Sequence, residues 1–201
     1  MPADPLPCLT PRLRLRRFAP EDLFALQAYR GDPLTGRFQG WAPQSDADAA
    51  AWILRMQTLP FCPPGDWFQL AIAMADGNRL IGEIGLRRHA GRPHQAELSF
   101  TLDRAWHGQG LATEAVRAIV ALLWADSTLH RLQALADQRN VASMRLLQRL
   151  GMTRLRTCQV PFRGETCTQW LHLLERPDRL AATRKHRLLE PSVAAAARRI
   201  G

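Results

Sequence analysis

The chain of 201 residues has no long hydrophobic run and none of the short motifs that hold metals. Its longest uninterrupted apolar stretch, residues 118–125, is far shorter than the roughly 20 residues of a membrane-spanning helix. The first residues show no basic segment followed by an apolar core, so we expect neither a secretion signal nor a membrane partner. No H-E-x-x-H motif is present, and we expect no metal site.

Cysteine is scarce, and its four copies lie far apart along the chain. Cys8, Cys62, Cys158 and Cys167 lack the spacing of a disulfide framework or a zinc site, so we expect free thiols in a reducing cytoplasm. With 46% hydrophobic and 22% charged residues, the composition is that of a soluble globular protein with one sizeable core.

Lysine is nearly absent, yet arginine raises the net charge to +9, and this charge is uneven. Residues 176–201 hold seven basic side chains against two acidic ones. A basic nucleic-acid-binding protein is therefore one alternative for this chain. No aromatic residue after Trp170 could stack on bases, so we favour a solvated basic tail over a nucleic-acid partner.

Hydrophobic periodicity and turn signals predict the order β-α-α-β-β-β-α-β-α-β-β. Asp76-Gly77 lies between two apolar runs and predicts a hairpin there. Strands are expected at 12–16, 67–74, 79–87, 96–102, 131–136, 152–160 and 166–174, and helices from Pro20, from Ser45, after Gly110 and over 140–150.

The clearest strand pattern lies immediately before a turn rich in glycine. Its apolar face holds Ala96, Leu98, Phe100 and Leu102, and its polar face holds Glu97, Ser99, Thr101 and Asp103. In the turn, Gly108, Gly110 and Ala112 allow an anion to approach the backbone closely, and the following helix adds the positive end of its dipole. The turn predicts a pyrophosphate-binding site. The alternative is a glycine-rich connector that binds no ligand.

These residues resemble the GNAT N-acetyltransferases, whose signature [Q/R]-x-x-G-x-[G/A] falls here on residues 107–112. Further stretches resemble the RimJ/RimL-like branch, which acetylates N-terminal amines of ribosomal proteins and some small amines: 9–16, 80–85, 110–115, Asn140-x-x-Ser143 and 146–152. The resemblance covers residues 9–175 and leaves 1–8 as an N-terminal extension and 176–201 as the tail. It implies an α/β (α+β) GNAT fold with a mixed, mostly antiparallel sheet of about seven strands.

The resemblance also implies acetyl-CoA as co-substrate. In this family the fourth and fifth strands splay apart, and the pantetheine arm lies in the gap. The residues expected to contact the cofactor are Leu98, Phe100, Leu102, His107, Gly108, Gln109, Gly110, Leu111, Ala112, Thr113, Asn140 and Ser143. Asn140 has a second expected role, as the cap of the helix that follows it.

Glu97 is the candidate general base, because it lies on the polar face of the strand that leads into the turn. An N-terminal amine has a pKa of about 8, so a weak base acting directly or through water suffices. The alternative is a surface glutamate paired with one of the many arginines. Glu83 and Glu165 are reserve candidates for the base.

Ser143 is the candidate acid for the departing thiolate, as the resemblance to some members of the branch implies. The alternative is that Ser143 only makes a local hydrogen bond on its helix. Two positions depart from the family pattern. His107 stands where Gln or Arg is usual, and Leu147 stands where many members have a tyrosine; Tyr29 is the sole tyrosine here.

The function expected from these residues is an acetyl-CoA-dependent N-acetyltransferase that moves an acetyl group directly to a primary amine in a ternary complex. The acceptor is a protein N-terminus or a small amine, and the enzyme is a cytoplasmic monomer or homodimer. The alternative is a CoA-binding module without robust catalysis. Four aromatic residues lie in or beside loops that line the acceptor groove of this fold, and none is assigned to substrate: Phe38, Trp41, Trp67 and Trp170.

Overall fold

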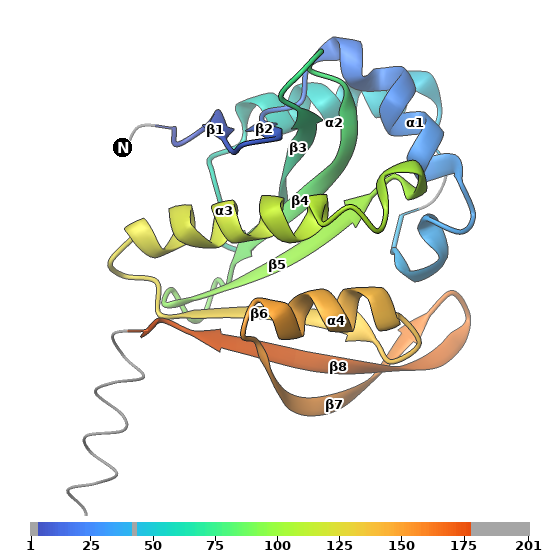
Figure 1. Ribbon diagram of the computed structural model, residues 1–201. Helices are drawn as coiled ribbons and strands as arrows, with labels where there is room; N and C mark the ends of the chain where they lie inside the picture. Colours follow the sequence, from blue (N-terminus) through green and yellow to red (C-terminus); the bar gives the residue numbers. More distant parts are fainter. Residues whose placement is uncertain (1–3, 42–43, 178–201) are drawn as a thin grey trace, which may run out of the picture.

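The computed structural model describes residues 4–41 and 44–177, which form one eight-stranded sheet with helices on both faces (Figure 1). The spatial order is β1-β2-β3-β4-β5-β6-β8-β7, and neighbouring strands are antiparallel except β5 and β6. The strands are β1 (Cys8–Leu9), β2 (Leu13–Arg16), β3 (Phe68–Met74), β4 (Leu80–Arg88), β5 (Gln95–Leu102), β6 (Arg131–Asp137), β7 (Thr153–Phe162) and β8 (Glu165–Glu175). The α-helices are α1 (Leu23–Gly31), α2 (Asp46–Thr58), α3 (Leu111–Ala125) and α4 (Val141–Arg149).

The predicted order and the mostly antiparallel sheet are confirmed, and one short strand was missed. Cys8 pairs with Leu15 and Leu9 with Arg14, which makes β1 an eighth strand at the edge. Two residues are too few to show period-two alternation, so no pattern in the sequence indicated β1. Most of the predicted basic tail, residues 178–201, lies outside the described residues.

Two clusters of buried side chains hold the helices against opposite faces of the sheet. On one face, α3 and α4 contribute Val116, Ile119 and Leu146 to the larger cluster. On the other face, Leu26 of α1 and Ile53 of α2 belong to the second cluster. Burying one such side chain contributes roughly 1.5–3 kcal/mol to stability. These clusters fix α3 and α4 on the same side of the sheet (Figure 1).

The sheet opens between β5 and β6 (Figure 1). The two strands pair only over Gln95–Glu97 and Arg131–Gln133, although β5 continues to Leu102 and β6 to Asp137. The unpaired backbone therefore borders a gap within an otherwise continuous sheet, as the resemblance implied.

The direction of the backbone groups on β5 follows from its pairing with β4. His89 N donates to Gln95 O at 2.9 Å, and Asp103 N donates to Ile81 O at 2.8 Å. Because bonding alternates along an antiparallel strand, the odd-numbered residues of β5 bond to β4. Leu98, Phe100 and Leu102 instead turn their N–H and C=O groups toward the gap.

Within the described residues, no helix combines the length and the hydropathy that crossing a membrane requires. All four cysteines are free thiols, as expected from their spacing.

Candidate functional site

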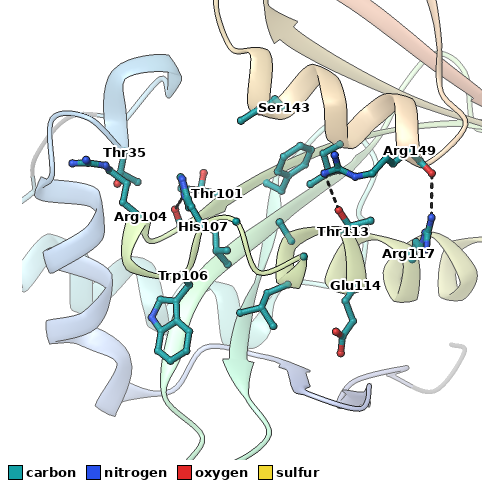
Figure 2. A pocket seen from close by; sticks show the side chains of 18 of the residues that line it. Thr35, Thr101, Arg104, Trp106, His107, Thr113, Glu114, Arg117, Ser143 and Arg149 are labelled. Carbon is teal, nitrogen blue, oxygen red and sulfur yellow. Dashed lines mark hydrogen bonds between the residues drawn. The ribbon is translucent and has the colours of Figure 1, made fainter.

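A cavity of about 1150 Å³ lies where the gap between β5 and β6 meets the start of α3 (Figure 2). Its walls come from the β1–β2 turn, the loop between α1 and α2, the end of β5 with the glycine turn and α3 that follow it, and α4. The strand edge that lacks a partner and the N-terminus of α3 therefore share one space.

The glycine turn places unpaired backbone donors in this cavity. Gly108 has φ +76° and Gly110 has φ +78°, a region that side chains disfavour, and Gly110 is the N-cap of α3. Glu114 N donates to Gly110 O at 3.1 Å, which is the first hydrogen bond of the helix. The N–H groups of Leu111, Ala112 and Thr113 precede it and have no partner within the helix. Together with the helix dipole, these groups form an anion-binding site.

Asn140 and Ser143 lie across the cavity from the turn, on the first turn of α4. Asn140 Oδ1 accepts a hydrogen bond from Ser143 N at 3.1 Å, so the predicted capping role of Asn140 is confirmed. Within residues 4–41 and 44–177, the Ser143 hydroxyl makes no hydrogen bond, and Ser143 lines the cavity. The local bond on this helix is thus made by the backbone of Ser143 rather than by its hydroxyl.

His107, the unusual residue of the signature, turns its ring back toward β5. Its Nε2 lies 2.9 Å from Leu102 O, and because a carbonyl only accepts, Nε2 carries the proton and donates. The ring therefore ties the glycine turn to the end of β5. The backbone of the turn is left to contact an anion.

Comparison with known proteins agrees with this geometry. A family model described as an acetyltransferase (GNAT) domain matches residues 12–153. The chain belongs to the GNAT acetyltransferase family. It is an acyltransferase by this membership, and the predicted family is confirmed.

Three known proteins illustrate the similarity of this GNAT chain to others. It is 26% identical over 145 residues to an uncharacterized N-acetyltransferase p20 of Bacillus licheniformis, which covers 72% of this chain and 81% of that one. A putative ribosomal-protein-serine acetyltransferase from Vibrio cholerae superposes with a TM-score of 0.71 and 19% identity, covering 86% of this chain and 99% of the other. RimL, a ribosomal L7/L12 alpha-N-protein acetyltransferase solved with coenzyme A, superposes with a TM-score of 0.70 and 16% sequence identity. The superposition covers 84% of this chain and 97% of the RimL chain.

The expected cofactor residues of this GNAT domain gather around the cavity, with two exceptions. Leu98 and Gln109 do not line it. The Leu98 side chain is buried in the core, and Gln109 O accepts a hydrogen bond from Arg12 Nη1 at 3.0 Å. The others all line the cavity: Phe100, Leu102, His107, Gly108, Gly110, Leu111, Ala112, Thr113, Asn140 and Ser143.

The structure does not bring Glu97 into the cavity. Its carboxylate forms an ion pair with Arg87 at 2.7 Å, directly across the β4–β5 ladder. This geometry is the one expected under the alternative stated above, a glutamate paired with an arginine. The role of Glu97 as general base stays a prediction. Glu83 is also held elsewhere, in a buried ion pair with Arg30 at 2.5 Å, and Glu165 is exposed beside the β7–β8 turn.

No tyrosine reaches the cavity in the described part of the chain. Tyr29 is buried between α1 and the sheet, where burial and then the charge of Glu83 raise its pKa well above the ordinary value. Leu147, at the position of the usual tyrosine, is 1% exposed and packs in the core. Among the residues of α4 that line the cavity, Ser143 is the one with a hydroxyl group, and its role as acid stays a prediction.

Sequence reasoning missed several cavity residues because they lie on other elements than the motifs. Thr35 and Gln39 enter from the α1–α2 loop, where Gln39 Nε2 donates to Phe100 O at 3.4 Å. Phe38 lines the cavity beside them, whereas Trp41, Trp67 and Trp170 do not. The other missed lining residues include Thr101, Arg104, Arg117 and Arg149.

The β1–β2 turn clamps the first turn of α3 through Glu114. Thr10 Oγ1 donates to the Glu114 carboxylate at 2.6 Å, and Arg12 adds its backbone N at 3.0 Å and its guanidinium at 2.7 Å. Burial raises the pKa of Glu114, but the hydrogen bonds from Thr10 and then Arg12 outweigh it, so the pKa is lowered. The β1–β2 turn thus anchors the helix that carries the anion-binding donors.

Glu114→Gln is expected to lower the free energy of unfolding at neutral pH by about 1–2 kcal/mol, since charge-assisted bonds become neutral ones. Because the pKa of Glu114 is lower in the folded state, the stabilisation is complete at a pH above the unfolded-state pKa of about 4.3. It is lost as the pH falls through the folded-state pKa. Urea unfolding at neutral pH and at about pH 3 should therefore show the difference between the two proteins shrinking in acid. A difference independent of pH would contradict the role of the charge.

The tip of the β7–β8 hairpin holds the α1–α2 loop through one side chain. Arg163 Nη2 donates to three carbonyl oxygens, those of Gly36 at 3.1 Å and of Gln39 and Trp41 at 3.3 Å. Arg163 has φ +51° and Gly164 has φ +82°, a two-residue turn in which asparagine is favoured over arginine at the first position. The strained arginine thus holds the loop that forms one wall of the cavity.

Arg163→Asn is expected to release this loop without weakening the hairpin, because asparagine suits the left-handed conformation better. Hydrogen exchange followed by mass spectrometry should show amides of residues 36–41 exchanging at least about tenfold faster, with the melting temperature unchanged or raised. Arg163→Lys, which keeps the charge but not the planar donor group, is the matched comparison and should give an intermediate rate. Equal exchange in all three proteins would refute the contact.

Proposed function

We propose that this enzyme transfers an acetyl group from acetyl-CoA to a primary amine, directly and within a ternary complex. The observation that carries the proposal is the single cavity joining the unpaired N–H groups of α3 to the unpaired edge of β5. A pyrophosphate fits the first set of donors. An amide-bearing arm such as pantetheine fits the unpaired edge of β5, where it would hydrogen-bond to the backbone as an added strand does. The CoA complex of RimL, which has a similar fold, supports this choice of ligand.

Residues of the chain supply binding and positioning along that path. Leu111, Ala112 and Thr113 hold the pyrophosphate through their backbone N–H groups, and the backbone of Leu98 and the C=O of Phe100 bond the pantetheine amides. Acetyl-CoA supplies the acetyl group as a thioester. The N–H of Phe100 stabilises the developing oxyanion at the carbonyl carbon.

The chemical step requires a neutral amine and a proton for the thiolate. As the N–C bond forms and the C–S bond breaks, Ser143 gives its proton to the sulfur and is reprotonated by water. The amine loses its surplus proton to water, which suffices for an N-terminal amine with a pKa of about 8. Glu97, held by Arg87, is not needed at the reacting atoms on this path.

The acceptor enters between the α1–α2 loop and the end of β5, beside Thr35, Phe38 and Arg104. We assign the acceptor to protein N-termini or small amines and the enzyme to the RimJ/RimL-like branch in the cytoplasm. The structural similarity to the Vibrio cholerae protein and to RimL, both named as ribosomal-protein acetyltransferases, supports this assignment.

Titration with acetyl-CoA tests the binding half of the proposal. Calorimetry should detect a single site, and the melting temperature should rise with ligand concentration. Absence of both signals at millimolar acetyl-CoA would overturn the proposal. Release of CoA thiol in the presence of a panel of peptides and amines tests the transfer half. Binding without any release would favour the CoA-binding module, the alternative that the missing tyrosine of α4 supports.

A further inference from the structure

Two arginines on adjacent helices present their guanidinium groups to the α3–α4 end of the cavity. Arg117 lies on α3, Arg149 is the last residue of α4, and both are exposed and line the cavity (Figure 2). Neither forms an ion pair with any acidic residue of the described segments, 4–41 and 44–177. Arg12, on the opposite side of the glycine turn, is neutralised by Glu114 instead.

Hydrogen bonds fix the two arginine side chains between α3 and α4, each at its own place. Arg149 Nη2 donates to Thr113 Oγ1 at 3.2 Å, and Arg117 Nη2 donates to Arg149 O at 3.2 Å (Figure 2). Each guanidinium has five N–H donors, so most donors of both groups stay available. Both cations lack an acidic partner within residues 4–41 and 44–177, and a bound anion would supply one.

The distance of this pair from the glycine turn indicates which anion fits. Thr113 belongs to the turn of α3 that carries the unpaired N–H groups, and Arg117 follows it by four residues, a rise of about 6 Å along the helix. A ligand with a pyrophosphate on the helix N-terminus and a second phosphate group one helical turn away would satisfy both sites. CoA has this arrangement, because its ribose carries a 3′-phosphate in addition to the pyrophosphate.

We propose that Arg117 and Arg149 bind the 3′-phosphate of CoA and make the enzyme select CoA over dephospho-CoA. This inference rests on the proposed function, since it assigns one part of the same ligand. A phosphate monoester carries nearly two negative charges at neutral pH and accepts several charge-assisted hydrogen bonds. Paired guanidinium groups match that charge and geometry better than ammonium groups would.

Calorimetry with CoA and dephospho-CoA tests the assignment, because the two ligands differ only in the 3′-phosphate. The wild-type protein should bind CoA about ten- to a hundredfold more tightly than dephospho-CoA, as expected for charge-assisted bonds to one phosphate. Arg117→Ala and Arg149→Ala should each reduce the CoA affinity severalfold, and the double variant should bind both ligands equally. Arg145→Ala, on the exposed face of α4 and outside the cavity lining, is the matched control and should bind both ligands as the wild type does.

The outcomes separate this inference from the proposed function. If the wild-type protein binds neither ligand, the proposed function fails. If it binds both with equal affinity, the CoA site stands and the assignment of the two arginines is overturned. The assignment is also overturned if the variants lose affinity for both ligands in equal measure. The ratio of the CoA and dephospho-CoA affinities is measured on the wild-type protein, so this test does not depend on whether a variant folds. For the variants, circular dichroism without ligand shows whether each is folded.

Discussion

Gly110→Glu is expected to reduce the affinity for acetyl-CoA by more than about a hundredfold, which corresponds to roughly 3 kcal/mol. Gly110 is the N-cap of α3, its φ of +78° is unfavourable for a side chain, and it lines the cavity. A carboxylate there would stand among the donors that face the pyrophosphate. At about 4 Å and an effective dielectric constant of about 20, one pair of like charges costs about 4 kcal/mol.

Gly110→Gln separates charge from conformation, because glutamine has the same size and meets the same backbone strain without the negative charge. We expect it to lose far less affinity than Gly110→Glu, while both variants show a similar melting temperature without ligand. Calorimetric titration with acetyl-CoA measures the difference. Equal affinities for the two variants would mean that no anion is bound at this turn.

Ser143→Ala is expected to lower kcat by about a hundredfold or more, the usual contribution of a general acid. The dissociation constant for acetyl-CoA should change little, because the hydrogen bond from Ser143 to Asn140 Oδ1 uses the backbone N–H. An alanine keeps that bond and keeps α4 capped. The loss should therefore appear in the chemical step alone.

The measurement is CoA thiol release at saturating acetyl-CoA with the most active amine of the panel. Ser143→Cys supplies a different proton donor at the same position and should recover part of the rate. A variant Asn140→Ala, in contrast, removes the cap and should lower stability by about 1 kcal/mol. Undiminished kcat in Ser143→Ala would remove the serine from the mechanism and leave water as the proton source.

Local signals explain why so much of the fold could be predicted. The Ser45 side chain accepts from Asp48 N at 3.1 Å, and Asn140 caps α4 in the same way. Asp76-Gly77 joins β3 to β4 as the hairpin pattern indicated. In each case the residues that interact are near neighbours in the sequence, so their spacing carries the information.

Long-range partnerships account for what could not be predicted. The ion-pair partner of Glu97 is Arg87 on the adjacent strand, and nothing in the alternating pattern distinguishes that arginine from the many others. Arg163 contacts a loop more than 120 residues earlier in the chain. The placement of Arg117 and Arg149 at one end of the cavity depends on how α3 packs against α4, which neither helix pattern specifies.

The short ladder between β5 and β6 also has a mechanical consequence. Within residues 4–41 and 44–177, the β5–β6 ladder has only three residue pairs, so the sheet has a weakly paired line in its middle, which we call the seam. Contacts of α3 with α4 and the hydrogen bonds from Arg163 to the α1–α2 loop also bridge the seam. A ligand lying in the gap would add a bridge along the seam itself. Binding of acetyl-CoA would thus reduce the motion of strands β1–β5 relative to strands β6, β8 and β7 before the acceptor binds.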